Sequence, residues 1–291
     1  MFKYLHDQTV RLMNKGYASA EIAEELKVPP GLANNWPTRE YYGTISHNAK
    51  AVYQRYLGWY DGNPANLAPL PPVERACKMV AYMGGADAIL ERAAKDFEQG
   101  EYRWVADAMN LVVQSDPANT RARTLGADAL EQLGYQTESA TWRNSYLLGA
   151  HELRNGTPTG ASKAMVSPDV VRALTAALMF DYMATNLDGP RADGKHVVVN
   201  WSLTDTGERY ALNLQNAALT CIEDWHNPQA HVAVALDKSA LGALVTGQLT
   251  VDEAQSSGRI AIEGPRAVLE DLFALVDRTT STFALIEPRK P

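Results

Sequence analysis

The sequence predicts two kinds of domain in succession, first an all-helical region and then an α+β domain with an antiparallel sheet. Apolar residues recur at helical spacing between residues 73 and 154. Beyond a stretch rich in Gly, Ser and Thr, the apolar period changes from 3.6 to 2 and later returns to 3.6. A run of strands bordered by helices is typical of an α+β fold with the helices on one face of the sheet. We therefore expect four segments, namely 1–72, 73–154, the linker 155–164 and 165–291.

Composition and charge are those of an ordinary globular protein. Of the 291 residues, 46% are apolar and 21% charged, and 27 basic against 34 acidic side chains give a net charge of −7. Nucleic-acid binding is not expected, because it needs clustered excess Lys and Arg. Cys77 and Cys221 stand alone, without the spacing of a zinc site or a disulfide framework. No apolar run is long enough for a signal peptide or a transmembrane segment, so the chain as written is expected to be cytoplasmic.

The first segment is expected to form short helices. Residues 3–15 and 21–26 have helical apolar spacing, and Pro29 with Pro30 ends the second helix. The helix at 3–15 would begin with almost no N-terminal signal. That abrupt start leads us to expect that this chain is cut out of a longer one.

Residues 41–64 hold an unusual concentration of aromatic side chains, with five tyrosines, a tryptophan, a histidine and two cations. Ser46 is a good N-cap and the next glycine is Gly58, so we expect a helix that begins near His47. At helical spacing one face is polar and cationic, and it consists of His47, Lys50, Ala51, Gln54 and Arg55. The opposite face is apolar and aromatic and is expected to be anchored in a core; it consists of Val52, Tyr53, Tyr56 and Trp59.

Two interpretations of His47 follow from the residues alone. Free N–H groups at a helix N-terminus, next to His47 and Lys50, can bind an anion such as sulfate or phosphate. Alternatively, His47 is a capping or hydrogen-bonded structural histidine and the cations are merely solvated. A single histidine beside cations does not decide between them.

Residues 73–154 read as five helices, expected at 73–83, 86–99, 104–114, 120–133 and 139–154. The proline-rich connector 66–72 precedes them. Two turn glycines, Gly100 and Gly134, stand thirty-four residues apart, which resembles the period of tetratricopeptide repeats. An ordinary antiparallel helix bundle is the alternative. Because an incomplete repeat leaves apolar faces that need a partner, we expect a two-fold dimer.

The last segment carries the pattern of the α+β domain. A long helix is expected at 170–187, followed by strands at 196–204, 208–215, 217–223, 230–236, 258–263 and 282–286. Helices are expected at 238–245, from 251, and at 265–277. Their apolar faces either close a core or leave an apolar cavity against the sheet, and the candidate cavity residues are Leu241, Leu244, Leu272 and Phe273.

Four motifs carry a family resemblance, in an order and spacing that follow the family along the whole chain. They are HDQTVR at 6–11, YYGTISHNAKAVYQRYLGWYDGNPANL at 41–67, GEYRWVA at 100–106 and ALEQLGYQTES at 129–139. The chain resembles the alkylsulfatases of the metallo-β-lactamase type, which cleave alkyl sulfates such as dodecyl sulfate to an alcohol and inorganic sulfate. The resemblance implies a catalytic metallo-β-lactamase domain with two zinc ions, a helical dimerisation domain, and a domain similar to sterol carrier protein type 2 that recruits aliphatic substrates.

The chain departs from that family in one respect. The HxHxDH motif and the other zinc ligands do not occur in it, so we expect no metal in this chain and no hydrolysis of sulfate esters by it alone. The resemblance places His47 near the sulfate in the active site. Tyr42, Asn48 and Arg55 are carried over as its neighbours, and Lys50 joins them as a cation on the same helix face.

The predicted function is therefore that of the C-terminal portion of an alkyl sulfatase, which supplies dimerisation, recruitment of the alkyl chain and sulfate-facing residues. Its expected partners are a second copy, the metallo-β-lactamase domain and an aliphatic sulfate ester or other alkyl-chain ligand. The resemblance also implies that full-length relatives can be exported by an upstream signal peptide. The alternative is an independent, non-catalytic protein that dimerises and binds hydrophobic ligands.

Overall fold

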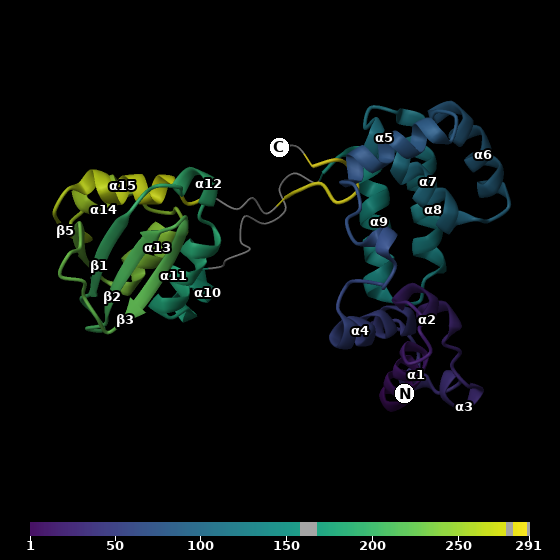
Figure 1. Cartoon of the computed structure of the whole chain (residues 1–291), viewed down its shortest axis with the longest axis horizontal. Helices are drawn as coiled ribbons and strands as arrows, with labels where there is room; N and C mark the ends of the chain where they lie inside the picture. Colours follow the sequence, from purple (N-terminus) through teal and green to yellow (C-terminus); the bar gives the residue numbers. More distant parts are fainter. Residues whose placement is uncertain (158–167, 278–281, 290–291) are drawn as a thin grey trace. The chain divides into compact units, whose positions relative to one another are not determined.

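The computed structural model describes residues 1–157, 168–277 and 282–289 (Figure 1). These residues belong to two compact units. Unit 1 comprises Met1–Thr159 with Thr282–Pro291, and unit 2 comprises Gly160–Ser281. The greater part of the expected linker, residues 158–164, lies outside the described residues.

Unit 1 begins with short helices, as the sequence predicts. They are α1 (Phe2–Met13), α2 (Ser19–Glu25), α3 (Pro30–Ala33), the 3-10 turn Trp36–Thr38, α4 (Ile45–Leu57) and the 3-10 turn Pro64–Asn66. The helix α3 was not predicted, because Pro29 and Pro30 were interpreted only as the end of the preceding helix; Pro30 is compatible with the first turn of a new helix. A small core joins α1, α2 and α4, and its members are Leu12, Ile22, Leu26, Ala49 and Tyr53.

Helix α4 differs from its prediction in its cap and in its buried face. Thr44, not Ser46, is the N-cap, because the Thr44 hydroxyl accepts a hydrogen bond from the His47 N–H at 2.9 Å. Tyr53 is buried, but Tyr56 and Trp59, which were expected in the core, are 58% and 68% exposed. Gly58 ends the helix with φ 78°, so Trp59 lies beyond the helical face on which it was placed.

The larger part of unit 1 is a layer of five helices that confirms the predicted order. These are α5 (Pro72–Tyr82), α6 (Ala86–Glu98), α7 (Tyr102–Ser115), α8 (Thr120–Gln136) and α9 (Ala140–Asn155). The expected turn at Gly134 is absent, because α8 continues to Gln136 and Gly134 lies inside the helix. A Cβ atom at Gly134 would lie 2.9 Å from Cδ2 of Leu147, so the glycine allows α8 and α9 to approach closely.

Unit 2 is an α+β domain, as predicted. Its elements are α10 (Pro168–Ala173), α11 (Ala176–Thr185), α12 (Gly189–Ala192), β1 (Val197–Leu203), β2 (Arg209–Gln215), β3 (Ala218–Glu223), β4 (Val232–Leu236), α13 (Lys238–Val245), α14 (Val251–Ser256), β5 (Ile260–Glu263) and α15 (Arg266–Ala274). The single long helix expected at 170–187 is divided into α10 and α11. Thr175 caps α11 by accepting a hydrogen bond from the Leu178 N–H at 3.2 Å.

The five strands form one mixed sheet in the order β3-β2-β1-β4-β5. The prediction of a purely antiparallel sheet is therefore wrong at one pair, because β1 and β4 are parallel, with Trp201 opposite Val234. The other three pairs are antiparallel. The connection from β3 to β4 carries the chain to the far side of β1. Trp201 and Phe180 are fully buried at the centre of the core that the sheet shares with its helices.

The expected last strand at 282–286 is also wrong. Residues 282–289 form no strand and belong to unit 1, where Ile286 packs against the helical core. Within the described ranges, no helix is both long enough and apolar enough to cross a bilayer.

Candidate functional site

A pocket of about 580 Å³ surrounds His47 in unit 1. Two segments far apart in the sequence line it, the loop and first turn that open α4 and the first turns of α9. The lining residues are Tyr42, Gly43, Thr44, His47, Asn48, Thr141, Trp142, Ser145 and Tyr146. They include no carboxylate, and they offer hydroxyl, amide, indole and imidazole groups as hydrogen-bond donors.

Direct hydrogen bonds hold the loop before α4 against the start of α9. The main-chain N–H of Ala140 donates to the carbonyl of Tyr41 at 2.9 Å. The hydroxyl groups of Ser139 and Thr141 both donate to the carbonyl of Tyr42 at 2.6 Å. Ser139 is buried, so its bond is shielded from water more than that of Thr141. The N-terminal ends of the two helices therefore meet at the pocket.

The orientation of the His47 ring is set by Trp142. The indole Nε1–H donates to Nδ1 of His47 at 3.4 Å, and the two rings are nearly perpendicular, at an interplanar angle of 71°. This bond requires Nδ1 to be an acceptor, so Nε2 is the ring atom that carries the proton in the neutral imidazole. Such a ring offers a hydrogen-bond donor at Nε2.

The first turn of α4 is only partly open to an anion. The N–H of His47 already donates to Thr44, and the N–H of Ile45 donates to the carboxylate of Glu40. An anion in this pocket would therefore depend on side chains more than on the free helix N-terminus that the sequence suggested.

The structure brings together three of the five predicted sulfate-facing residues. Tyr42, His47 and Asn48 all line the pocket, whereas Lys50 and Arg55 do not. Arg55 lies eight residues beyond His47, about 12 Å along the helix axis.

Lys50 belongs to a different electrostatic neighbourhood, the one around Glu24 of α2. The pKa of the Glu24 carboxyl is lowered mainly by its hydrogen bond to Arg103, and Lys50 contributes to the lowering. Lys50 therefore acts electrostatically on Glu24, and it is not among the residues that line the pocket.

Sequence reasoning missed the α9 side of this pocket. Thr141, Trp142, Ser145 and Tyr146 recur at the spacing of one helix face, and this polar and aromatic face was the available signal. Their nearness to His47, which lies 95 residues before Trp142, cannot be read from spacing.

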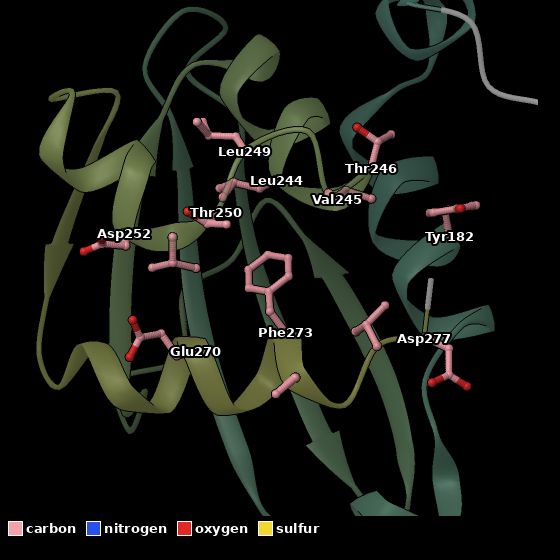
Figure 2. A pocket seen from close by; sticks show the side chains of 14 residues that line it. Tyr182, Leu244, Val245, Thr246, Leu249, Thr250, Asp252, Glu270, Phe273 and Asp277 are labelled. Carbon is pink, nitrogen blue, oxygen red and sulfur yellow. The ribbon is translucent and has the colours of Figure 1, made fainter. Parts of the chain in front are cut away.

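Unit 2 contains a second pocket, of about 570 Å³, bordered by α11, α13, α14 and α15. Figure 2 shows Leu244, Leu249 and Phe273 at its centre, with Asp252 and Glu270 on one side and Tyr182 and Asp277 on the other. Two of the four predicted cavity residues, Leu244 and Phe273, line it. The other two, Leu241 and Leu272, are buried in the core behind it.

The acidic rim of this second pocket is partly neutralised by Arg266. Its guanidinium lies 2.9 Å from a carboxylate oxygen of Asp252 and 2.6 Å from one of Glu270. The bonds to Glu270 and then to Asp252 raise the pKa of Arg266, so it stays charged. The apolar centre is therefore bordered by an ion-paired, hydrated edge.

The residues present do not fit a zinc site. Within residues 1–157, 168–277 and 282–289, no three His, Cys, Asp or Glu side chains converge. His6, the histidine of the first motif, already uses both ring nitrogens, with contacts to Asp7 at 3.1 Å and to the Tyr56 hydroxyl at 2.9 Å.

The chain thus consists of a helical unit with a polar and aromatic pocket and an α+β unit with a pocket that has an apolar centre and an acidic rim. Its two parts match two family models, "Alkyl sulfatase dimerisation" over residues 18–156 and "Alkyl sulfatase C-terminal" over residues 164–288. The chain therefore belongs to the alkylsulfatases, as their dimerisation and C-terminal domains.

Individual relatives agree with this assignment. The chain is 49% identical over 288 residues to the alkyl/aryl-sulfatase BDS1 of Saccharomyces cerevisiae, covering 99% of this chain and 44% of that protein. It is 43% identical to a linear primary-alkylsulfatase of Pseudomonas sp., again covering 99% of this chain and 43% of the relative. The structure of the inverting sec-alkylsulfatase Pisa1 from Pseudomonas sp. matches with a TM-score of 0.94 at 43% identity, over 100% of this chain and 46% of Pisa1. The chain thus spans less than half the length of these relatives.

Proposed function

We propose that this chain serves an alkylsulfatase in three ways: it dimerises, it binds the alkyl chain of the substrate in unit 2, and it presents the His47 pocket to the sulfate ester. The observation that carries the proposal is the pocket of unit 2, which has an apolar centre and lies within a domain of alkylsulfatase type. Its apolar lining, Leu244, Val245, Leu249, Val251, Phe273 and Val276, gives an alkyl tail a surface on which to leave water.

The His47 pocket suits the other end of such a substrate. A sulfate ester is an anion, and the pocket combines several hydrogen-bond donors with the absence of a carboxylate from its lining. Nε2–H of His47 can donate to a sulfate oxygen, and a protonated His47 can deliver a proton to the departing oxygen. The resemblance implies that zinc chemistry is supplied by the metallo-β-lactamase-type domain; this chain's own part is to bind and orient.

The helical layer supports the proposal of a dimer. Several large apolar side chains on α5, α7, α8 and α9 are exposed, among them Val73, Met79, Tyr82, Trp104, Tyr135 and Leu148. Tyr82 is 93% exposed at the end of α5. Closed two-fold contacts are the commonest way to bury such faces.

Two measurements test the proposal. Binding of a fluorescent fatty-acyl probe, and its displacement by dodecyl sulfate below the concentration at which micelles form, tests the pocket of unit 2. Sedimentation at tens of micromolar tests the dimer. An absence of probe binding at micromolar protein would refute alkyl recruitment, and a clean monomer of about 32 kDa, the mass of one chain, would refute dimerisation.

The same apolar pocket would serve the alternative function, an independent carrier that dimerises. The mass of the denatured polypeptide isolated from its source separates the two. A product of the mass of this chain alone favours the carrier, and a product of about twice that mass favours the enzyme.

A further inference from the structure

The last described residues of the chain, residues 283–289, are called the tail here and are bound to the rest of unit 1 through a buried carboxylate. Glu152 of α9 is 0% exposed. Its oxygens accept hydrogen bonds from three successive main-chain N–H groups, those of Leu285 at 2.9 and 3.0 Å, Ile286 at 2.9 Å and Glu287 at 3.1 Å. Three consecutive amides that converge on one anion form a nest, which fixes the local backbone of the segment.

Two further contacts surround this nest. The side-chain amide of Gln114 on α7 donates to the carbonyl of Ile286 at 2.7 Å. The Ile286 side chain packs into the helical core, where its Cδ1 lies 3.9 Å from the place that a Cβ atom on Gly149 would take. Gly149 therefore leaves room on α9 for a branched aliphatic side chain.

An ion pair completes the contact. Arg123 of α8 lies 2.5 Å from a carboxylate oxygen of Glu287, and the two side chains are only 18% and 21% exposed. The same guanidinium donates to the main-chain carbonyl of Glu152 at 3.2 Å, so Arg123 is engaged with the tail and with the α9 backbone. The charge of Glu152 is instead met by the amides of the tail.

A buried carboxylate is costly unless hydrogen bonds replace the water that it loses. Within the described part of the chain, the bonds recorded for the Glu152 carboxylate come from residues 285–287. The hydrogen bonds from the tail thus offset the cost of burying the Glu152 carboxylate. When the tail is not bound, the carboxylate loses those hydrogen bonds.

We infer that α7, α8 and α9 form a recognition site for a short peptide that bends around a carboxylate, occupied by residues 283–289 of the same chain. The site takes a segment that offers three successive amide N–H groups, a branched aliphatic side chain and a carboxylate directly after it. Unit 2 is continuous with unit 1 at residues 159–160 and again at 281–282. The docked tail therefore gives unit 2 a second, noncovalent attachment to the helical unit, and release of the tail leaves unit 2 on a single tether.

Hydrogen exchange in the full chain tests the site directly. The amides of residues 285–287 should exchange at least about 100-fold more slowly than in a free peptide of residues 282–291. In Glu152→Gln, which keeps the shape but loses the charge, they should exchange at least about tenfold faster than in the unchanged chain. The control is Glu131→Gln, which removes a partly exposed carboxylate of α8 that pairs with Arg154 and should leave these three amides unchanged. Free-peptide exchange rates in the unchanged chain, or no effect of Glu152→Gln, would overturn the inference.

A charge exchange keeps the test valid even if Glu152→Gln disturbs α9. Glu287→Arg should accelerate exchange at residues 285–287, and the double variant Arg123→Glu with Glu287→Arg should restore at least part of the protection. Failure of the double variant to restore any protection in a chain with unchanged helical content would count against recognition of the tail by charge.

Cross-linking identifies the occupant. In a mixture of light and heavy isotope-labelled chains, an intramolecular tail gives cross-links between the tail and α9 within one label only. Mixed-label cross-links would show that the tail of a second copy occupies the site, and would overturn the assignment to the same chain. Neither readout depends on alkyl binding or on sulfatase activity, so the inference stands or falls apart from the proposed function.

Discussion

The indole Nε1–H of Trp142 lies 3.4 Å from Nδ1 of His47, although the two residues are 95 positions apart. The contact joins the first turn of α9 to the first turn of α4. It makes Nδ1 an acceptor and leaves Nε2–H as the ring donor that is available to a ligand. Trp142 is therefore a positioning residue for His47.

Removal of that donor should loosen the His47 ring without removing it. In the enzyme assembled with its catalytic domain, we expect Trp142→Phe to lower kcat by about tenfold and to leave KM for the alkyl chain little changed, because small errors of orientation reduce turnover. A kcat equal to that of the unchanged enzyme would show that Trp142 only fills space.

Variants at two neighbouring residues of α15, Phe273 and Leu272, distinguish effects on alkyl binding from effects on stability. Phe273 lines the pocket of unit 2, so Phe273→Asp should weaken binding of a fatty-acyl probe by tenfold or more, because a charge replaces apolar contact. Leu272 is 1% exposed in the core, so Leu272→Ala should lower the free energy of unfolding by about 2–5 kcal/mol and leave binding by the folded protein nearly unchanged. Probe titration and urea unfolding measure both. Equal binding by Phe273→Asp and the unchanged chain would place the alkyl site elsewhere.

A side chain at Gly134 should prevent the close approach of α8 and α9 and lower the free energy of unfolding. A Cβ atom there would lie 2.9 Å from Cδ2 and 3.0 Å from Cγ of Leu147, so Gly134→Ala must displace a half-buried leucine at the contact of the two helices. Overpacking of this kind costs about 1–3 kcal/mol, which exceeds the gain of about 1 kcal/mol in helix propensity. Gly31→Ala in α3, where nothing lies within 4 Å, is the matched control and should be neutral or stabilising. Thermal unfolding that ranks the two variants the other way would contradict this packing.

The order of the elements could be predicted from the sequence, because apolar periodicity and helix- or strand-breaking residues are local properties. Contacts between segments that are far apart in the sequence could not be predicted in this way. Thr44 and Ser46 are both residue types that cap helices, and in the folded chain Thr44 is the N-cap of α4. The 282–286 segment has the apolar character of a strand, but Glu152 and the helical core bind it instead. Gly134 resembles a turn glycine because its sequence repeats that of Gly100, yet packing against Leu147 keeps it helical.

The candidate sites show the same limit. His47, Tyr42 and Asn48 could be found because they lie within one motif, whereas Trp142 joins them only through tertiary structure. Leu244 and Leu272 both belong to apolar helix faces, and a helical period cannot tell which of them faces a cavity and which faces a filled core.

The two cysteines should differ sharply in reactivity. Burial, with a smaller contribution from Glu223, raises the pKa of Cys221 to about 12, whereas Cys77 is exposed on α5. The thiolate is the reactive form, so Cys221 should stay almost unreactive below pH 10 and begin to react only as the pH approaches its pKa. Alkylation at pH 8 followed by mass spectrometry should give one adduct, at Cys77, and none in Cys77→Ser. A second adduct at pH 8 in the folded chain would contradict the burial of Cys221.

His47 itself provides the decisive test of the first pocket. His47→Ala removes the Nε2–H donor and the proton that the ring can deliver, so turnover of an alkyl sulfate by the assembled enzyme should fall by about a hundredfold or more. Zinc content should not change, because His47 belongs to no cluster of metal-ligating side chains in the described ranges. Lys50→Ala is the matched control on the same helix: Lys50 does not line the pocket, and its loss should change turnover by less than about threefold. Loss of zinc with the fold intact would make His47 a metal ligand, and full turnover by His47→Ala would leave it a structural residue of the α4 and α9 junction.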